Sequence, residues 1–76
     1  RICAPLAAAG PAFAETVVTY LERGRSLEAT ARALFVHPNT VRYRLRRVAD
    51  LIGWDVTRSR DAFVVQVALA VARLPL

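Results

Sequence analysis

The sequence predicts a small all-α domain of four or five helices. Apolar residues recur at helical rather than strand spacing, and glycine or proline marks the ends of most such segments. The 76 residues suffice for one domain only, and a chain this short buries about 60% of its unfolded surface. We therefore expect a single, marginally stable domain over residues 1–76. Because the chain opens on Arg1 rather than on methionine, we expect it to be a fragment of a longer protein.

The first two segments are separated by Gly10-Pro11. The Ala-rich stretch before this pair fits either the tail of a linker or a short lead-in helix. A helix is predicted from Ala12 to about Arg23, with Gly24 as its C-cap. The apolar residues that keep helical spacing along it are Phe13, Val17, Tyr20 and Leu21.

A short helix from Leu27 to about Leu34 follows. Ser26 is a good N-cap for it, and Glu28 lies in the first turn, where the helix dipole favours an anion. Leu27, Ala31 and Leu34 make its inner face. The connector 35–37 then leads directly to Pro38, which suits the first position of the next helix because its missing N–H would be unpaired there.

The longest patterned stretch is the predicted helix from Pro38 to Ile52, capped by His37 and ended by Gly53. At about 100° per residue, an apolar stripe faces a core, namely Val41, Leu45, Val48 and Ile52. The opposite arc carries hydrogen-bonding and cationic groups, namely Asn39, Thr40, Arg42, Tyr43, Arg46, Arg47 and Asp50. Trp54 is placed for the apolar contact that often follows a glycine cap.

A last helix is predicted from Arg60 to about Arg73, with Ser59 as its cap. Gln66 is the only polar residue in its middle, so we expect the helix to bury more than one face. We expect it to contact the helix 12–23 and also either a second copy of the domain or another domain of the parent chain. We interpret Phe63 as a core residue.

The short helix, the tight connector and the longer basic helix together indicate a helix-turn-helix over residues 26–52. Between Ser26 and Asp50 only Glu28 is acidic. In such a motif the second helix lies in the major groove of DNA. The exposed face of the helix Pro38–Ile52 is therefore the candidate binding surface.

Composition supports an anionic partner. All 11 basic residues are arginine, against 6 acidic residues, for a net charge of +5. Codon bias explains the choice of arginine over lysine equally well, although not where the arginines cluster. Cys3 is the only cysteine, which excludes an intrachain disulfide and a cysteine-based zinc site and fits a reduced setting.

We expect a cytoplasmic protein with no membrane partner. The apolar stretch 2–14 superficially resembles a secretory signal, but Gly10 and Pro11 interrupt it and only one charge precedes it. The longest apolar tract, 62–72, is too short to span a bilayer, which needs about 20 residues.

At residues 34–47, Leu-Phe-Val-His-Pro-Asn-Thr-Val-Arg-Tyr-Arg-Leu-Arg-Arg, the chain resembles the C-terminal helix-turn-helix domain of the PucR/CdaR class of bacterial transcriptional regulators. The lead-in Thr19-Tyr20-Leu21 with Gly24, Gly53 after the basic helix, and the Ala-Leu-rich last helix fall in the order of that family. The resemblance implies that the chain is the C-terminal fragment of a longer regulator, whose upstream parts sense a metabolite, often a purine-related compound or a sugar acid. It also implies that the DNA-binding part pairs up on DNA.

The chain is similar as well to the Fis-type helix-turn-helix, in which the start of the second helix reads the major groove. The matching positions here are 37–43. One departure is Phe35, where many helix-turn-helix motifs place a glycine with positive φ. We therefore expect the turn to be built differently from the commonest form.

Seven side chains are candidates for contact with DNA, namely His37, Asn39, Thr40, Arg42, Tyr43, Arg46 and Arg47. The arginines can neutralise phosphates, and Arg46 especially can reach a guanine, while Asn39 suits adenine. Tyr43 can contact a phosphate through its hydroxyl, or a sugar or thymine methyl through its ring. Plainer interpretations exist: a charge run is usually a solvated helix face, Thr40 can merely support the helix end, and a neighbouring helix can cover Tyr43. Arg44 lies at the edge of the buried stripe, where its stem can pack and its head can pair with an acid.

We predict sequence-specific binding of double-stranded DNA by a homodimer, or by a domain that packs against other domains of the parent chain. The alternative is a protein-interaction module in which the last helix assembles subunits and the arginines contact an acidic protein. RNA binding is disfavoured because the chain shows no aromatic platform for unpaired bases. A single histidine without a nearby Cys, Asp or Glu constellation makes no metal site and no triad, so we expect neither a cofactor nor catalysis.

Overall fold

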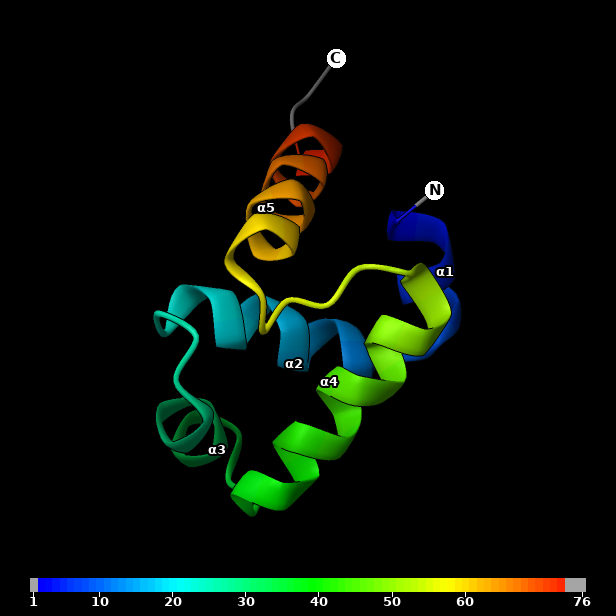
Figure 1. The fold of residues 1–76 in the computed structure, drawn as a ribbon. Helices are drawn as coiled ribbons and strands as arrows, with labels where there is room; N and C mark the ends of the chain where they lie inside the picture. Colours follow the sequence, from blue (N-terminus) through cyan, green and yellow to red (C-terminus); the bar gives the residue numbers. More distant parts are fainter. Residues whose placement is uncertain (1, 74–76) are drawn as a thin grey trace.

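The computed structural model describes residues 2–73, which form five α-helices and, within that range, no strand (Figure 1). The helices are α1 (Cys3–Ala8), α2 (Pro11–Glu22), α3 (Leu27–Leu34), α4 (Pro38–Ile52) and α5 (Ser59–Arg73). The all-α prediction is confirmed, and the N-terminal segment is the short lead-in helix rather than a linker tail. The bounds of the other helices agree with prediction to within one residue.

Helix α4 packs against three other helices. It contacts α3 across the turn, α2 behind it and α1 near its C-terminal end (Figure 1). Its predicted stripe is confirmed, since Val41, Leu45 and Val48 are buried and Ile52 packs against the same core. The other helices contribute further buried side chains to this core, namely Leu6, Val17, Tyr20, Ala31 and Val65.

The ends of α3 and α4 are capped as the sequence predicted. The Ser26 Oγ accepts a hydrogen bond from the Ala29 N–H at 3.1 Å, and the His37 Nδ1 accepts one from the Asn39 N–H at 3.0 Å. Gly53 ends α4 with φ 77°, in the left-handed region that favours glycine. These caps fix where α4 begins and ends, and therefore which residues can form its outer face.

Two threonines are fully buried, which the apolar pattern did not predict. Thr16 in α2 and Thr30 in α3 each donate the side-chain hydroxyl to the carbonyl four residues earlier, Ala12 and Ser26, at 2.7 Å. A threonine that satisfies its hydroxyl within its own helix presents its methyl group to the core at little cost. Both positions fit the inner face of their helix once threonine is counted as apolar.

The loop between α4 and α5 is held by Arg25, which precedes α3. The Arg25 guanidinium donates to the Thr57 carbonyl at 3.1 Å and to the Ser59 Oγ at 3.2 Å. Within the loop, the Asp55 carboxylate accepts bonds from the Thr57 hydroxyl and amide, which lower the pKa of Asp55. This polar loop ties the start of α5 to the turn between α2 and α3.

The placement of Phe63 in the core was wrong, because its side chain is 67% exposed. Helix α5 turns Ala62 and Val65 inward, while Phe63, Val67 and Val71 form an exposed stripe along the outside. The rest of this small domain is large enough to cover only one face of α5. The other face of this almost wholly apolar helix therefore stays in solvent. Trp54, by contrast, is half-buried and packs against the core.

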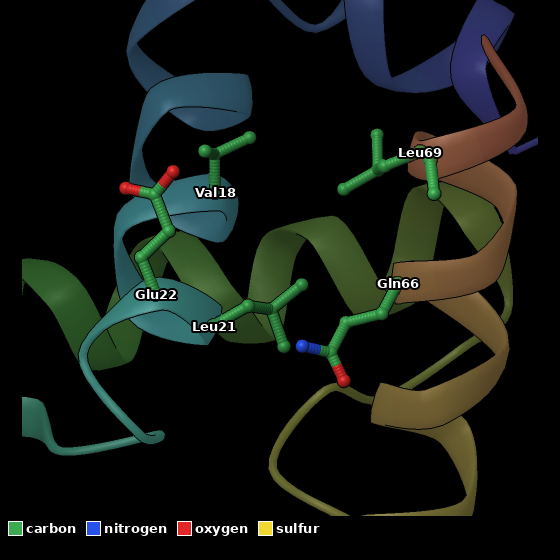
Figure 2. A pocket seen from close by; sticks show the side chains of 6 residues that line it. Val18, Leu21, Glu22, Gln66 and Leu69 are labelled. Atoms are coloured by element: carbon green, nitrogen blue, oxygen red, sulfur yellow. The ribbon is translucent and has the colours of Figure 1, made fainter. Parts of the chain in front are cut away.

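The expected contact between α5 and α2 is loose. Figure 2 shows a hollow between the two helices, with Val18 and Leu21 of α2 facing Gln66 and Leu69 of α5. The closer packing of α5 is onto α1, where the Cys3 thiol points to the Ala68 carbonyl. Helix α5 is therefore attached along one edge to the body made by α1–α4.

We expect Leu45→Ala to lower the free energy of unfolding by about 2–5 kcal/mol, because Leu45 is 2% exposed and fills the core under α4. Leu51→Ala, on the same helix at 41% exposure, is the matched control and should change it by less than about 1 kcal/mol. Denaturant unfolding measures both. Equal losses for the two variants would mean that α4 presents a different face to the core.

Candidate nucleic-acid interface

The outer face of α4 is polar, cationic and open to solvent. Six of the seven predicted contact residues are exposed, and Thr40 is half-buried, so the structure brings them together at the N-terminal end and along the outside of one helix. Tyr43 is 61% exposed, so no helix within residues 2–73 covers it. Asp50 on the same helix and Asp55 in the following loop line one hollow with Arg42 and Arg46, so acidic groups border one side of the basic face.

The first turn of α4 is ordered by hydrogen bonds. Because the His37 Nδ1 accepts from the Asn39 amide, the neutral ring carries its proton on Nε2 as a donor for an outside acceptor such as a phosphate. The Arg42 guanidinium donates to the Asn39 Oδ1 one turn earlier. Asn39 and Arg42 therefore form a paired unit, in which the second lone pair of the Asn39 Oδ1 and its Nδ2 group remain available for a bidentate contact with adenine.

The dimensions of this face suit a DNA groove. A helix with its side chains is about 10–12 Å across, and the major groove of B-DNA is about 12 Å wide. Arg42, Arg46 and Arg47 are all exposed on α4, so their guanidinium groups can meet the phosphates that border the groove. This arrangement can recognise an anionic polymer by charge and by hydrogen bonds.

Arg44 differs from its neighbours because it is half-buried. Its guanidinium donates to the Thr16 Oγ1 on α2 at 3.2 Å, so its stem packs as expected but its partner is a hydroxyl rather than an acid. The same Thr16 oxygen donates to the Ala12 carbonyl. This contact joins α4 to α2 and helps to set which residues of α4 face outward. The apolar pattern of the sequence did not predict the contact between Arg44 and Thr16, because threonine counts as polar in that pattern.

The turn between α3 and α4 has the common left-handed geometry, so the expectation of a differently built turn was wrong. Phe35 adopts φ 58° and ψ 43° even though it is not glycine. The reason lies in the end of α3, where the Val36 N–H donates to the Ala31 carbonyl at 3.0 Å, a closure that needs a left-handed residue between them. The Phe35 side chain is 94% exposed and gains no packing in return.

Two other kinds of site find no support in the described residues. Among residues 2–73, no three His, Cys, Asp or Glu side chains gather closely enough to hold a metal ion. None of the described helices has both the length and the apolar character needed to cross a membrane. The outer face of α4 is thus the surface that both the sequence and the structure favour.

Comparison with known proteins gives a family match over this region. The family model of the PucR C-terminal helix-turn-helix domain matches residues 13–71. An uncharacterized protein of Mycobacterium tuberculosis is 57% identical over 70 residues, which is 92% of this chain and 17% of that protein. The carbohydrate diacid regulator of Escherichia coli is 46% identical over 41 residues, 54% of this chain and 11% of that regulator.

A solved structure agrees with the fold. The crystal structure of a regulator of polyketide synthase expression from Bifidobacterium adolescentis matches with a TM-score of 0.75 and 60% sequence identity. The match covers 76% of this chain and 23% of that one. The chain therefore spans less than a quarter of the length of these three proteins.

We expect Phe35→Gly to raise the free energy of unfolding by up to about 1 kcal/mol. Relief of the left-handed strain, about 1–2 kcal/mol, exceeds the entropy that glycine adds to the unfolded chain, about 0.4–1 kcal/mol. Phe35→Ala is the control, because it removes the ring but keeps the strain and should give no gain. Thermal unfolding distinguishes them, and a loss of several kcal/mol in Phe35→Gly would contradict the observed exposure.

Proposed function

The chain belongs to the PucR C-terminal helix-turn-helix family of bacterial transcriptional regulators, and on this premise we propose that it binds double-stranded DNA sequence-specifically. The family is one of transcriptional regulators rather than of enzymes. The observation that carries the proposal is the outer face of α4, where arginines and hydrogen-bonding side chains are exposed on the second helix of a helix-turn-helix. Helix α4 lies in the major groove, and its N-terminal half meets the base edges.

Each group on α4 has a proposed role. Arg42 and Arg47 neutralise phosphates on the borders of the groove, while Arg46 reaches a guanine edge or a third phosphate. Tyr43 places its ring or its hydroxyl against the sugar-phosphate backbone. His37 donates from Nε2 to a phosphate near the start of the helix. Asn39 and Thr40 are the remaining polar groups there and can donate to a phosphate or a base edge.

We propose further that the chain is the C-terminal output domain of a longer, metabolite-responsive regulator acting in the cytoplasm. The support is that relatives such as the carbohydrate diacid regulator of Escherichia coli are several times longer than the matched region. Residues 2–73 are taken up by the five helices of the helix-turn-helix domain. The sensed compound would then be bound by other parts of the parent protein.

We expect a triple variant with Arg42, Arg46 and Arg47 replaced by Ala to bind duplex DNA more weakly, with its fold unchanged. The slope of log affinity against log salt should flatten by about 0.9 for each phosphate that is no longer neutralised. The matched control replaces Arg23, Arg58 and Arg60, three exposed arginines outside the outer face of α4, and changes the net charge by the same amount. Fluorescence anisotropy across a salt titration gives both slopes. Equal slopes for the two triple variants would show that the arginines of α4 do not contact the DNA and would contradict the proposal.

A second proposal concerns assembly. Phe63, Val67 and Val71 recur at every fourth residue of α5 and form an exposed apolar stripe without a charged member. An uncharged stripe can pair with itself about a two-fold axis, so we propose that two copies associate through α5. A two-fold dimer would place two α4 helices on half-sites of one duplex, which is the common arrangement of helix-turn-helix proteins.

We expect sedimentation at micromolar concentration to show a dimer that Val67→Glu dissociates. Gln66→Glu adds the same charge at the neighbouring exposed position outside the stripe and should leave the dimer intact. A monomer at every concentration would contradict pairing through α5. A stable dimer that binds no duplex would instead favour the protein-interaction module over the DNA-binding domain.

A further inference from the structure

Five residues of the described chain have positive φ, and Phe35 is the one whose side chain has no evident use within the domain. Three of the five are glycines, for which this conformation is ordinary. The fourth, Arg25, uses its side chain to bind the Thr57 carbonyl and the Ser59 hydroxyl. Phe35 combines a conformation that glycine would adopt without strain with a ring that is 94% exposed to water. Both features disfavour the isolated domain, which points to a partner outside it for the ring.

The position of Phe35 places it beside the proposed groove contacts. It lies two residues before the cap of α4, in a shallow hollow whose polar members are Glu28, Arg32 and His37. Arg32 and His37 are exposed and can donate to phosphates close to the ring, while Glu28, also exposed, is the one acidic group of the hollow. Cationic and hydrogen-bonding groups that flank an aromatic side chain are typical of a surface facing the backbone of a nucleic acid.

The surroundings of Phe35 fit DNA better than a protein partner. The exposed apolar residues Phe63, Val67 and Val71 lie together on α5, whereas the apolar neighbours of Phe35 in its hollow are Ala31, Val36 and Pro38, three smaller side chains. A protein-binding patch is usually a contiguous apolar area with a polar rim. A single ring close to two donors, Arg32 and His37, instead suits the narrow apolar strips of a duplex, where sugar carbons and thymine methyl groups alternate with phosphates.

We propose that Phe35 contacts the apolar edge of duplex DNA at the border of the groove that holds α4, packing against deoxyribose carbons or a thymine methyl. This inference rests on the proposed DNA binding and adds a contact outside α4. A DNA contact of this kind accounts for a phenylalanine in the turn where glycine would be more stable. The contact is uncharged, so it contributes to affinity without releasing counterions.

The test uses Phe35→Gly, which we expect to fold at least as stably as the wild type. Its affinity for a duplex selected by the wild-type domain from a random-sequence pool should fall about tenfold, as expected when one aromatic ring is removed from an interface. The salt slope should stay unchanged, in contrast to the arginine variants. Phe35→Tyr keeps the ring and should retain most of the affinity. Leu51→Ala, which removes an exposed apolar side chain near the C-terminal end of α4, should have no effect.

The two possible DNA groups are separated by a duplex in which deoxyuridine replaces thymidine. If the deoxyuridine duplex lowers the affinity of the wild type but not that of Phe35→Gly, the ring contacts a thymine methyl; if it lowers neither affinity, or both alike, the ring contacts deoxyribose. Unchanged affinity of a folded Phe35→Gly for a duplex that the wild type binds would overturn the inference, leave the proposed function intact and point to a protein partner for the ring. Failure of the wild type to select any duplex would overturn both.

Discussion

Burial of one stripe of α4 is the constraint on which the rest of the structure depends. Val41, Leu45 and Val48 pack under α4 against α1, α2 and α3, and a helix that buries this stripe must turn the opposite arc to solvent. The arginines that face outward do so because of the apolar residues between them, not because of any contact of their own. The Arg44 contact with Thr16 adds a polar anchor at the edge of the same stripe. The orientation of α4 about its own axis thus determines both the core packing and the exposure of the cationic face.

The turn before α4 shows the opposite relation between stability and function. The end of α3 requires a left-handed residue, and glycine would meet that requirement without strain. The chain instead carries Phe35 and leaves its ring in water, directly before the cap that fixes the first turn of α4. Stable domains tolerate such local costs most readily where a side chain contacts a partner. The exposed apolar stripe on α5 is a similar local cost, carried by a different helix.

Most of the fold followed from local patterns in the sequence. Ser26, His37 and Gly53 set helix ends through contacts within a few residues, and the α4 stripe follows from spacing alone. Features that depend on distant parts of the chain did not follow. The Arg25 contacts with the α4–α5 loop join residues more than thirty positions apart, and the exposure of Phe63 depends on how much surface the other helices can cover. For the candidate site, the exposure of residues on α4 was predictable, whereas the pairing of Asn39 with Arg42 and the geometry at Phe35 required coordinates.

The central claim is that α4 lies in the major groove, and methylation interference on a duplex selected by the domain tests it most directly. Dimethyl sulfate methylates guanine at N7, which lies in the major groove, and adenine at N3, which lies in the minor groove. Our account predicts that methylation of particular guanines at N7 blocks binding. These guanines should cluster in one short stretch of the duplex for each bound α4. Interference confined to adenine N3 would place the domain in the minor groove and contradict the account.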